Sequence, residues 1–315
     1  MKNIPVLNAS GKSLAEAYEN ALIKLYADGG RMKTQYDKPD DPASIDATMN
    51  ITIEDPLTDP MIHKAFPGGI EDLREYVMEM QGAKDHWVKN LNDKEDTRWE
   101  YTYHGRFAHY GTWKEKSRVS CDHNHGIFET CGVSCEKNQI EQVTCGKPTN
   151  QIDAVIDKLV KQPFSRQAQL ITWMPSLDLV CYDAPCLQSV WLRIMEEDGI
   201  WYLNTNIRFR SNDAWGAYFM NSFGLTMFLK DVIAKPISEK SGKEVKLGRI
   251  NWQADSWHIY GKDIKQAKER LFDRLESTKF EDRIFNFYDP DIQDMYNEAE
   301  AVIVEKIRKQ DEKYQ

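Results

Sequence analysis

A cysteine that could act as a nucleophile stands at position 186. Residues 183–188 read Asp-Ala-Pro-Cys-Leu-Gln, and an Arg-Phe-Arg-Ser-Asn-Asp run begins 22 residues after the cysteine, at Arg208. The thiolate is the reactive form of cysteine and nearby cations favour it, so Arg166 and Arg210 are candidates to lower the pKa of this thiol. A single cysteine is more often a small buried hydrophobic residue. The chemical interpretation therefore depends on the residues that accompany Cys186.

Other polar residues that could serve the same site occur in separate motifs along the chain. Glu75 lies on an expected helix, seven residues before Gly82. A carboxylate can move protons, but most glutamates are simply solvent-exposed, so both interpretations of Glu75 stand. The remaining motifs are Ser165-Arg166-Gln167, Trp173, Arg210-Ser211-Asn212-Asp213, Asn221 and His258-Ile259-Tyr260.

In this order, the motifs resemble the active-site core of the thymidylate synthase family, over roughly residues 15–270. The resemblance implies an α+β fold, a thymidylate-synthase-like mixed sheet with surrounding helices, in one domain that spans residues 1–315 and packs as a homodimer through the sheet. It also implies folate-dependent one-carbon transfer to C5 of a pyrimidine nucleotide monophosphate. The donor would be 5,10-methylenetetrahydrofolate and the nucleophile Cys186.

The expected roles of individual residues follow from this resemblance. The expected catalytic residues are Cys186, Glu75, Asp183 and Tyr103, with Tyr101 and His104 as alternatives to Tyr103 for proton relay. Substrate binding is expected from Arg31, Arg166, Arg210, Ser211, Asp213, Asn221, His258 and Tyr260, and folate binding from Trp99 and Asp213. In the family, the arginine that corresponds to Arg166 reaches the site from the partner subunit. Gln167 replaces a second arginine of the family's pattern.

The residue types suit the implied chemistry. A thiolate that adds at C6 of a pyrimidine makes C5 nucleophilic, and a carboxylate acting through water can move protons at the base and at the folate. An asparagine side chain presents one donor group and one acceptor, which match O4 and N3–H of uracil. Asn221 therefore favours uracil over cytosine, depending on how its amide is oriented.

Three features favour a hydroxymethyl product over a methyl product. Asp183 stands three residues before Cys186, where typical thymidylate synthases carry an apolar residue, and its carboxylate could hold a water. The cysteine is followed by Leu187-Gln188 and not by the usual histidine. Residues 308–315 are charged, unlike the small apolar tail of typical synthases. We expect hydroxymethylation of dUMP; the alternatives are dUMP methylation and 5-hydroxymethylation of dCMP or CMP.

Two further classes of protein compete with this interpretation. One is a nucleotide- or RNA-binding regulator that keeps the fold without turnover, which the presence of both Cys186 and Glu75 disfavours. The other is a cysteine hydrolase, for which His258 is the only core partner and no oriented triad is visible. The enzyme class, a transferase, is therefore preferred.

Four cysteines cluster in a charged segment at about residues 110–150, which we interpret as an insertion in the family's fold. Cys121, Cys131, Cys135 and Cys145 are separated by nine, three and nine residues, and His123 and His125 lie nearby. Four soft ligands could make a structural zinc site. The spacing lacks the close pairs of common zinc modules, so free thiols or a redox pair are favoured over zinc.

Composition limits the partners and the compartment. The net charge of −9 argues against an extended nucleic-acid surface, although a few arginines can bind one small anion. No apolar run approaches the ~20 residues that span a bilayer, and no export signal is evident. We expect a cytoplasmic protein, or one in the host cytoplasm if the source is viral, without membrane contact.

The elements that must position these residues can be outlined from periodicity. Helical spacing is expected at 13–26 behind a Ser13 cap, at 69–80, at 151–160, at 213–234 and at 289–308. Strands are expected at 49–53, 170–174, 189–196, 201–209 and 245–260, with a turn at 197–199. Residues 30–48 are polar and turn-rich, which predicts a mobile loop.

Overall fold

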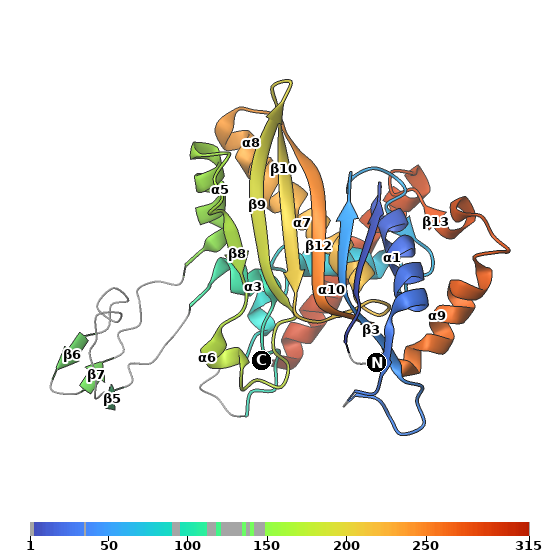
Figure 1. The fold of residues 1–315 in the computed structure, drawn as a ribbon. Helices are drawn as coiled ribbons and strands as arrows, with labels where there is room; N and C mark the ends of the chain where they lie inside the picture. Colours follow the sequence, from blue (N-terminus) through green and yellow to red (C-terminus); the bar gives the residue numbers. More distant parts are fainter. Residues whose placement is uncertain are drawn as a thin grey trace.

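A mixed eight-stranded sheet forms the centre of the computed structural model, which describes residues 3–34, 36–89, 95–111, 118–120, 134–136, 139–141 and 149–314 (Figure 1). The strand order is β1-β3-β12-β10-β9-β8, with β2 beside β3 and β11 beside β12. β1 runs parallel to β3 and β10 parallel to β12, while β3/β12, β10/β9 and β9/β8 are antiparallel. The strands are β1 (Val6–Gly11), β2 (Gly30–Met32), β3 (Ser44–Ile53), β8 (Gln169–Ile171), β9 (Leu187–Glu197), β10 (Ile200–Phe209), β11 (Asn212–Asp213) and β12 (Val245–Ile259).

Smaller elements complete the strand set. β4 (Ile62–His63) pairs with β13 (Ile284–Phe285), and β5 (Arg118–Ser120), β7 (Gln139–Glu141) and β6 (Ser134–Glu136) form a three-stranded sheet. These three strands lie in the expected insertion, of which the structure otherwise describes only residues 110–111 and 149–150 at its ends. Most of the segment at 110–150 lies outside the described residues.

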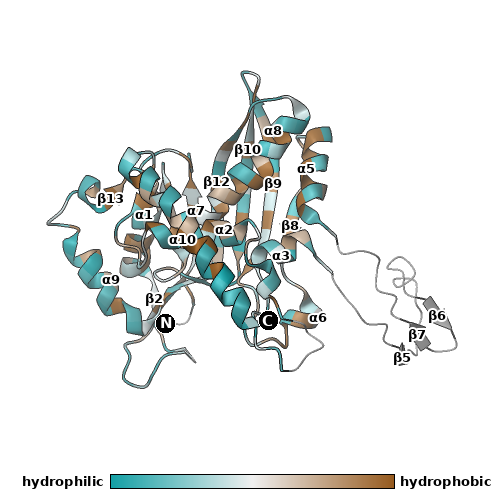
Figure 2. Cartoon of the chain, turned by 180° about the vertical axis from the view of Figure 1, so that it is seen from behind, coloured by the Kyte–Doolittle hydropathy of each residue, from teal (hydrophilic) through white to brown (hydrophobic). Residues whose placement is uncertain are grey.

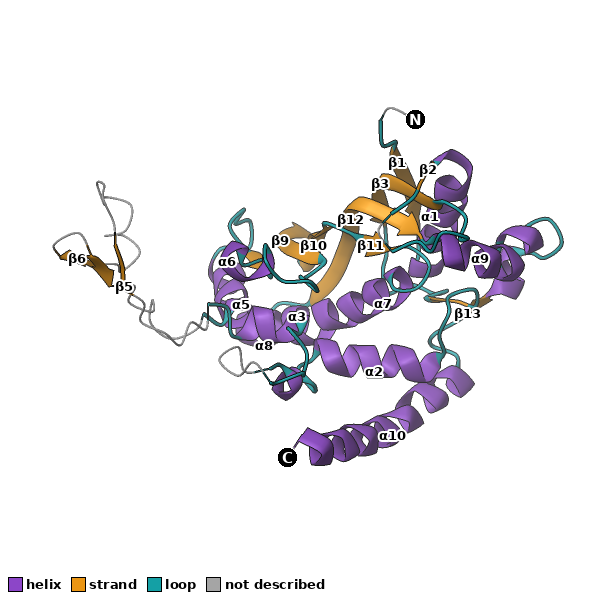
Figure 3. Cartoon of the chain, turned by 90° about the horizontal axis from the view of Figure 1, so that it is seen from below, coloured by secondary structure: helices purple, strands orange, loops and turns teal. Residues whose placement is uncertain are grey.

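The helices are stacked against one face of the central sheet (Figure 3). α7 (Tyr218–Phe228) lies next to the sheet, α2 (Ile70–Met80) packs on α7, and α10 (Pro290–Tyr314) packs on α2. The other helices are α1 (Leu14–Asp28), α3 (Tyr103–Ala108), α5 (Gln151–Lys161), α6 (Pro175–Asp178), α8 (Lys235–Ser241) and α9 (Ile264–Arg270). Short turns are the 3-10 helices η1 (Asp85–Trp87), η3 (Gly261–Asp263), η4 (Phe272–Arg274) and η5 (Phe280–Arg283), and the π-helix η2 (Leu229–Ala234).

The sequence of β10 shows why the helices cover one face. Trp201, Leu203 and Ile207 are buried, whereas residues 202, 204 and 206 between them are only half-buried. Successive side chains of a strand point to opposite faces, so the apolar set faces the helices and the mixed set faces away. The sheet therefore has one covered face and one less covered face.

α7 is mostly apolar, and all of its residues except Met220 are buried. Tyr218 meets Trp252 of β12 edge to face, with ring centroids 5.0 Å apart, and Gly224 lies against Tyr76 of α2. Such all-round hydrophobicity is typical of a buried helix. By contrast, much of the outer surface of α10 is hydrophilic (Figure 2). In the described part of the chain, no helix combines the length and apolarity needed to cross a membrane.

Most of the expected elements are present, but the segment 30–48 is not simply a loop. Gly30–Met32 forms β2 and Ser44–Ile53 forms β3, and the two strands pair with Gly30 opposite Asp46. Only the residues between these strands match the loop prediction. The pairing was missed because β2 is short and gains its stability from β3, not from its own pattern.

Two other expectations need correction. The strand expected at 170–174 ends at Ile171, and α6 begins at Pro175 soon after. The helix expected at 213–234 begins only at Tyr218, because Asn212 and Asp213 pair with β12. It then changes into the π-helix η2 before Pro236, which lacks the N–H that a regular α-helical ladder requires.

The close packing of α7 on α2 predicts the effect of adding one methyl group. The Cβ of Gly224→Ala would lie 2.7 Å from Tyr76 Cε1, so the Tyr76 ring must move. Alanine favours a helix by up to about 1 kcal/mol over glycine, but overpacking a core costs about 1–3 kcal/mol. We expect a net loss in the free energy of unfolding, measured by urea denaturation. Gly69→Ala, whose Cβ would approach only Asp72 at 3.8 Å, is the control and should change stability by less than about 1 kcal/mol.

Candidate active site

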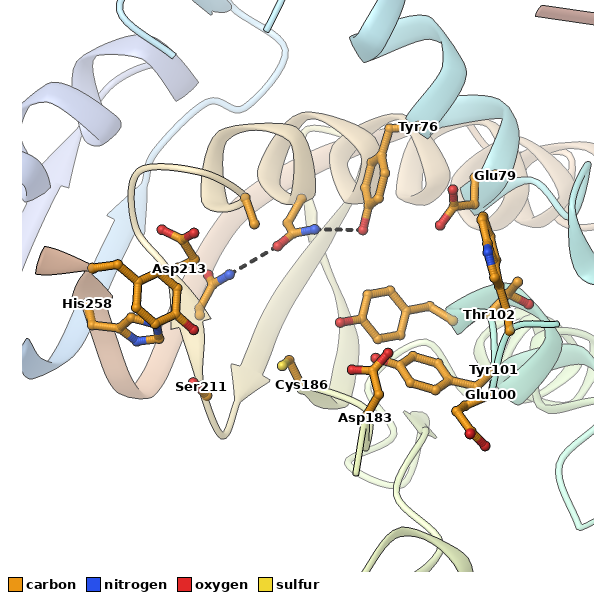
Figure 4. A pocket seen from close by; sticks show the side chains of 16 residues that line it. Tyr76, Glu79, Glu100, Tyr101, Thr102, Asp183, Cys186, Ser211, Asp213 and His258 are labelled. Carbon is orange, nitrogen blue, oxygen red and sulfur yellow. Dashed lines mark hydrogen bonds between the residues drawn. The ribbon is translucent and has the colours of Figure 1, made fainter. Parts of the chain in front are cut away.

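A pocket of about 400 Å³ opens between the end of the sheet and α2 and α7. Figure 4 shows Asp213 and His258 at one end of this pocket, Glu79 and Glu100 at the other, and Cys186 between them. Residues predicted from the sequence that line it are Trp99, Tyr103, Asp183, Cys186, Ser211, Asp213, Asn221, His258 and Tyr260. We call it the Cys186 pocket.

Cys186 is held at the start of β9 by Arg210. The Arg210 backbone N–H donates to the Cys186 carbonyl at 2.9 Å, and its guanidinium donates to the carbonyls of Pro185 at 3.0 Å and Ala184 at 2.6 Å. Burial raises the pKa of the Cys186 thiol, Arg210 lowers it and Asp183 raises it. Arg210 thus both shapes the loop that presents the thiol and favours its thiolate.

A chain of hydrogen bonds fixes the orientation of the Asn221 amide. The Trp252 indole N–H can only donate, and it donates to Asn212 Oδ1 at 3.2 Å. The Asn212 amide nitrogen therefore faces Asn221 and donates to its Oδ1 at 3.0 Å. The Asn221 nitrogen in turn donates to the Tyr76 hydroxyl at 2.6 Å, as the dashed lines in Figure 4 show. The amide orientation that the sequence left open is therefore set by Trp252.

These hydrogen bonds determine which groups Asn221 and Tyr76 can offer to a ligand. The Tyr76 oxygen already accepts a hydrogen bond, so its O–H is available to donate. Asn221 keeps one N–H and one acceptor lone pair of Oδ1. The pocket thus presents donors beside a single amide acceptor.

A second buried chain orients His258. The Ser256 hydroxyl donates to the Asp46 carboxylate at 2.9 Å, so it can only accept from His258 Nδ1, 3.2 Å away. The proton of the neutral ring then sits on Nδ1, and Nε2 keeps its lone pair. Burial lowers the pKa of His258, which favours this neutral form. Within the described residues Nε2 is buried without a partner, so it is an acceptor for a ligand hydroxyl.

Glu79, and not Glu75, is the α2 carboxylate that lines the pocket. Glu75 instead binds Lys84 at 2.7 Å and Lys306 of α10 at 2.5 Å. The spacing to Gly82 singled out Glu75, but the sequence does not reveal that Lys306 of the distant helix α10 binds it. The signal for Glu79 was its position one helical turn further on, on the same face. Burial raises the pKa of the Glu79 carboxyl, against the lowering effect of Lys84.

A single chain does not bring Arg31 or Arg166 to the pocket. Arg31 is exposed on β2 with its guanidinium over the Tyr26 ring, and Arg166 is exposed in the loop before β8. The described pocket-lining residues include four carboxylates and neither lysine nor arginine. The lining residues to which the sequence assigned no role include Tyr76, Glu79 and Asn212. Their hydrogen-bond partners come from other elements of the fold.

The zinc hypothesis concerns the cysteine-rich segment at about residues 110–150. The described residues do not include Cys121, Cys131, Cys145 or the side chain of Cys135. Among the residues that the structure does describe, no group of three or more His, Cys, Asp or Glu side chains could hold a metal ion.

Comparison with known proteins supplies independent information. The family model "Thymidylate synthase" matches residues 72–299. Two proteins named "Putative thymidylate synthase" are similar over most of the chain. That of Methanosarcina barkeri is 31% identical over 68% of this chain and 72% of its own length. That of Methanocaldococcus jannaschii is 29% identical over 79% of this chain and 88% of its own length. A third such protein, from Methanothermobacter marburgensis, is 33% identical over 38% of this chain, and the match spans about half (49%) of that protein's length.

A solved structure supports the same fold. Thermostable thymidylate synthase A from Bacillus subtilis matches with a TM-score of 0.53 over 82% of this chain and 84% of its own, at 16% identity. At this identity, the likeness concerns the fold alone.

The charges beside Cys186 predict its reactivity. Asp183 disfavours the thiolate, so Asp183→Asn should lower the pKa of Cys186 and speed its alkylation by iodoacetamide about two- to fivefold near neutral pH. The rate is measured by peptide mass spectrometry in a Cys181→Ser background. Glu100→Gln removes a pocket carboxylate that is not among the groups that shift the pKa of Cys186, and should leave the rate nearly unchanged. A slower or equal rate in Asp183→Asn would contradict the assignment.

Proposed function

The chain belongs to the thymidylate synthase family, and we propose that it transfers a one-carbon unit from 5,10-methylenetetrahydrofolate to C5 of a uracil nucleotide monophosphate, as a transferase. The observation that carries this proposal is the convergence of Cys186, Asn221 and His258 on one pocket from three separate parts of the chain. A regulator without turnover would not need a cysteine held beside a guanidinium. His258, the histidine that a cysteine hydrolase would need, lies at the Asp213 end of the pocket and not beside Cys186 (Figure 4), which disfavours that class.

The first step proposed is addition of the Cys186 thiolate to C6 of the base. The thiol proton leaves to water, and Arg210 favours this loss by stabilising the thiolate. The C5–C6 electron pair moves towards O4, where the Tyr76 O–H and the free Asn221 N–H can donate hydrogen bonds. C5 then becomes the nucleophile.

The chemistry of the pocket fits a folate at the end that contains Trp99 and Glu79. Trp99 and Tyr101 offer aromatic rings for the pterin at this end, whereas Asp213, expected to serve both nucleotide and folate, lies towards His258 at the other end (Figure 4). Backbone N–H groups of Trp215 and Gly216 orient Asp213 Oδ1 at 3.0 and 2.9 Å. When bound, the folate supplies an electrophilic one-carbon unit. Glu79, with a pKa raised by burial, is suited to carry a proton at this end.

The sugar and phosphate would bind on the other side. His258 Nε2 can accept from a sugar hydroxyl, with Tyr260 packed edge to face against it at 4.6 Å. Because the described lining of the pocket carries no cation, the phosphate requires Arg210 and, as in the family, Arg166 from a second copy of the chain. The less covered face of the sheet is the surface that we propose for this homodimer.

We propose hydroxymethylation as the outcome at C5. Transfer leaves an exocyclic methylene on the nucleotide; addition of water gives a hydroxymethyl group, whereas hydride from the folate gives a methyl group. Asp183 lines the pocket close enough to influence the pKa of Cys186, so it can hold a water near the new carbon. The second candidate is methylation, which the names of the relatives favour.

Product analysis tests both the reaction and the role of Asp183. Given dUMP and methylenetetrahydrofolate, we expect a nucleotide heavier by CH2O, with tetrahydrofolate released, by mass spectrometry. Asp183→Asn should lower the hydroxymethyl yield about tenfold or more, since the water loses its anionic acceptor. Cys186→Ser should abolish turnover while nucleotide binding persists. A product heavier by CH2, with dihydrofolate, would replace hydroxymethylation by methylation.

The chain of hydrogen bonds from Trp252 predicts base selectivity. In a Cys186→Ser background, calorimetry should show dUMP bound at least about tenfold more tightly than dCMP, because the cytosine amino group would face donors. Trp252→Phe removes the N–H that orients Asn212, so both amides can turn and the preference should fall several-fold. Tyr218→Phe is the control, because this buried hydroxyl has no hydrogen-bond partner in the described structure and touches Trp252 only through its ring. An unchanged preference in Trp252→Phe would contradict this explanation.

A further inference from the structure

Lys84 carries a buried ammonium group directly behind the Cys186 pocket. Only 5% of the residue is exposed, and its Nζ donates to Glu75 at 2.7 Å and to Glu79 at 3.2 Å. The same Nζ lies over the rings of Trp87 and Trp99, 5.5 and 5.4 Å from their centroids. A buried charge is costly unless it is paired, so these contacts hold the side chain in one position.

Lys84 is the inner part of a row of alternating charges that begins on α10. Lys306 of α10, with its side chain 58% exposed, donates to Glu75 at 2.5 Å; Glu75 binds Lys84; and Lys84 binds Glu79, which lines the pocket. We call these four residues the Lys84 network. Its two cations and two anions balance, and Lys306 occupies the Glu75 oxygen that Lys84 does not use.

α10 also fixes one wall of the network. Asp311 Oδ1 accepts from the Trp87 indole N–H at 2.6 Å and contacts His86 Nε2 at 2.6 Å. Trp87 packs edge to face on Trp99 with centroids 5.3 Å apart, and Trp99 lines the pocket. Two independent contacts therefore connect the last helix to the pocket end that contains Glu79.

We propose that α10 is a positioning element for the active site: through Lys306 and Asp311 it holds Lys84 against Glu79 and Trp99. Lys84 and Lys306 are positioning residues in this scheme, and Glu79 is the residue that they position. This inference rests on the proposed function for its catalytic consequence. The structural part of the inference, that Lys306 of α10 controls Glu79, does not depend on the proposed function.

Loss of Lys306 is expected to change the pKa of Glu79 in one direction, upwards. The ionised Glu75 then takes a larger share of the Lys84 ammonium, and the surroundings of Glu79 become more negative by one charge. Both changes disfavour the Glu79 carboxylate, so its pKa rises further. The other ionisable groups around Glu79 are Tyr76 on α2, Asp85 in η1, and Glu100 and Tyr101 in the pocket wall.

The test compares Lys306→Gln with Lys309→Gln. Lys309 is an exposed lysine of the same helix whose one ion pair within the described residues is to Glu305, at 3.5 Å. Glu79 is titrated by carboxyl-carbon NMR in the nucleotide-free protein and assigned with Glu79→Gln. Lys306→Gln should move the titration to higher pH by about half a unit or more, Lys306→Arg should restore it, and Lys309→Gln should not move it. The pH profile of kcat should follow, with KM for the nucleotide changed little.

Asp311→Asn provides a second, independent variant, because it weakens the hold on Trp87 without removing a cation from Glu75. It should lower kcat several-fold and change Trp87 and Trp99 fluorescence. An unmoved Glu79 titration in folded Lys306→Gln, or an equal shift in Lys309→Gln, would overturn the inference. Wild-type protein that fails to turn over dUMP would instead overturn the proposed function, and the nucleotide-free titration would still decide the role of α10.

Discussion

The packing of α7 between the sheet and α2 is the constraint on which the pocket depends. α7 brings Asn221 to the pocket from inside the core, and the absence of a side chain at Gly224 allows the Tyr76 ring of α2 to approach closely. The tyrosine hydroxyl then reaches the Asn221 amide. Because protein interiors are close-packed, a shift of either helix changes both the core and the hydrogen bonds of the pocket. Stability and recognition are therefore set by the same contact.

Removal from water is the common cause of the chemical character of the pocket. Burial raises the pKa of the Cys186 thiol and of the Glu79 and Asp213 carboxyls, and lowers that of His258. Each group is shifted towards its neutral form before a ligand arrives. Nearby charges then correct the shift locally, Arg210 at the thiol and Lys84 at Glu79. Desolvation is thus general, whereas charge acts on individual groups.

Local signals in the sequence were sufficient for much of the fold. Ser13 caps α1 by accepting from the Glu16 N–H, and the turn at Asp198 and Gly199 has the positive φ angles typical of a tight hairpin. The order of the motifs was enough to predict nine of the side chains that line the Cys186 pocket. These features depend on neighbours in the chain or on a shared pattern of residues.

What could not be predicted depends on contacts between distant segments. Glu75 was expected at the site from its spacing to Gly82, and the sequence does not reveal that Lys306, 231 positions away, binds this carboxylate. Tyr76 lies outside the motifs, and Asn212 stands inside one without an expected role; both gain importance from their hydrogen bonds to Asn221. The start of α7 was misplaced because Asn212 and Asp213 join the sheet beside β12. In each case tertiary pairing outweighed local preference.

The donor-only character of the Trp252 indole has a consequence for divergence among related sequences. The polarity of the Asn212–Asn221–Tyr76 chain is imposed from a fully buried residue that does not line the pocket. An acceptor in place of that indole would reverse both amides in turn, and the groups presented to a base would be exchanged. A lineage could therefore alter which pyrimidine it accepts without replacing any residue that touches it, through a substitution that looks like ordinary core variation.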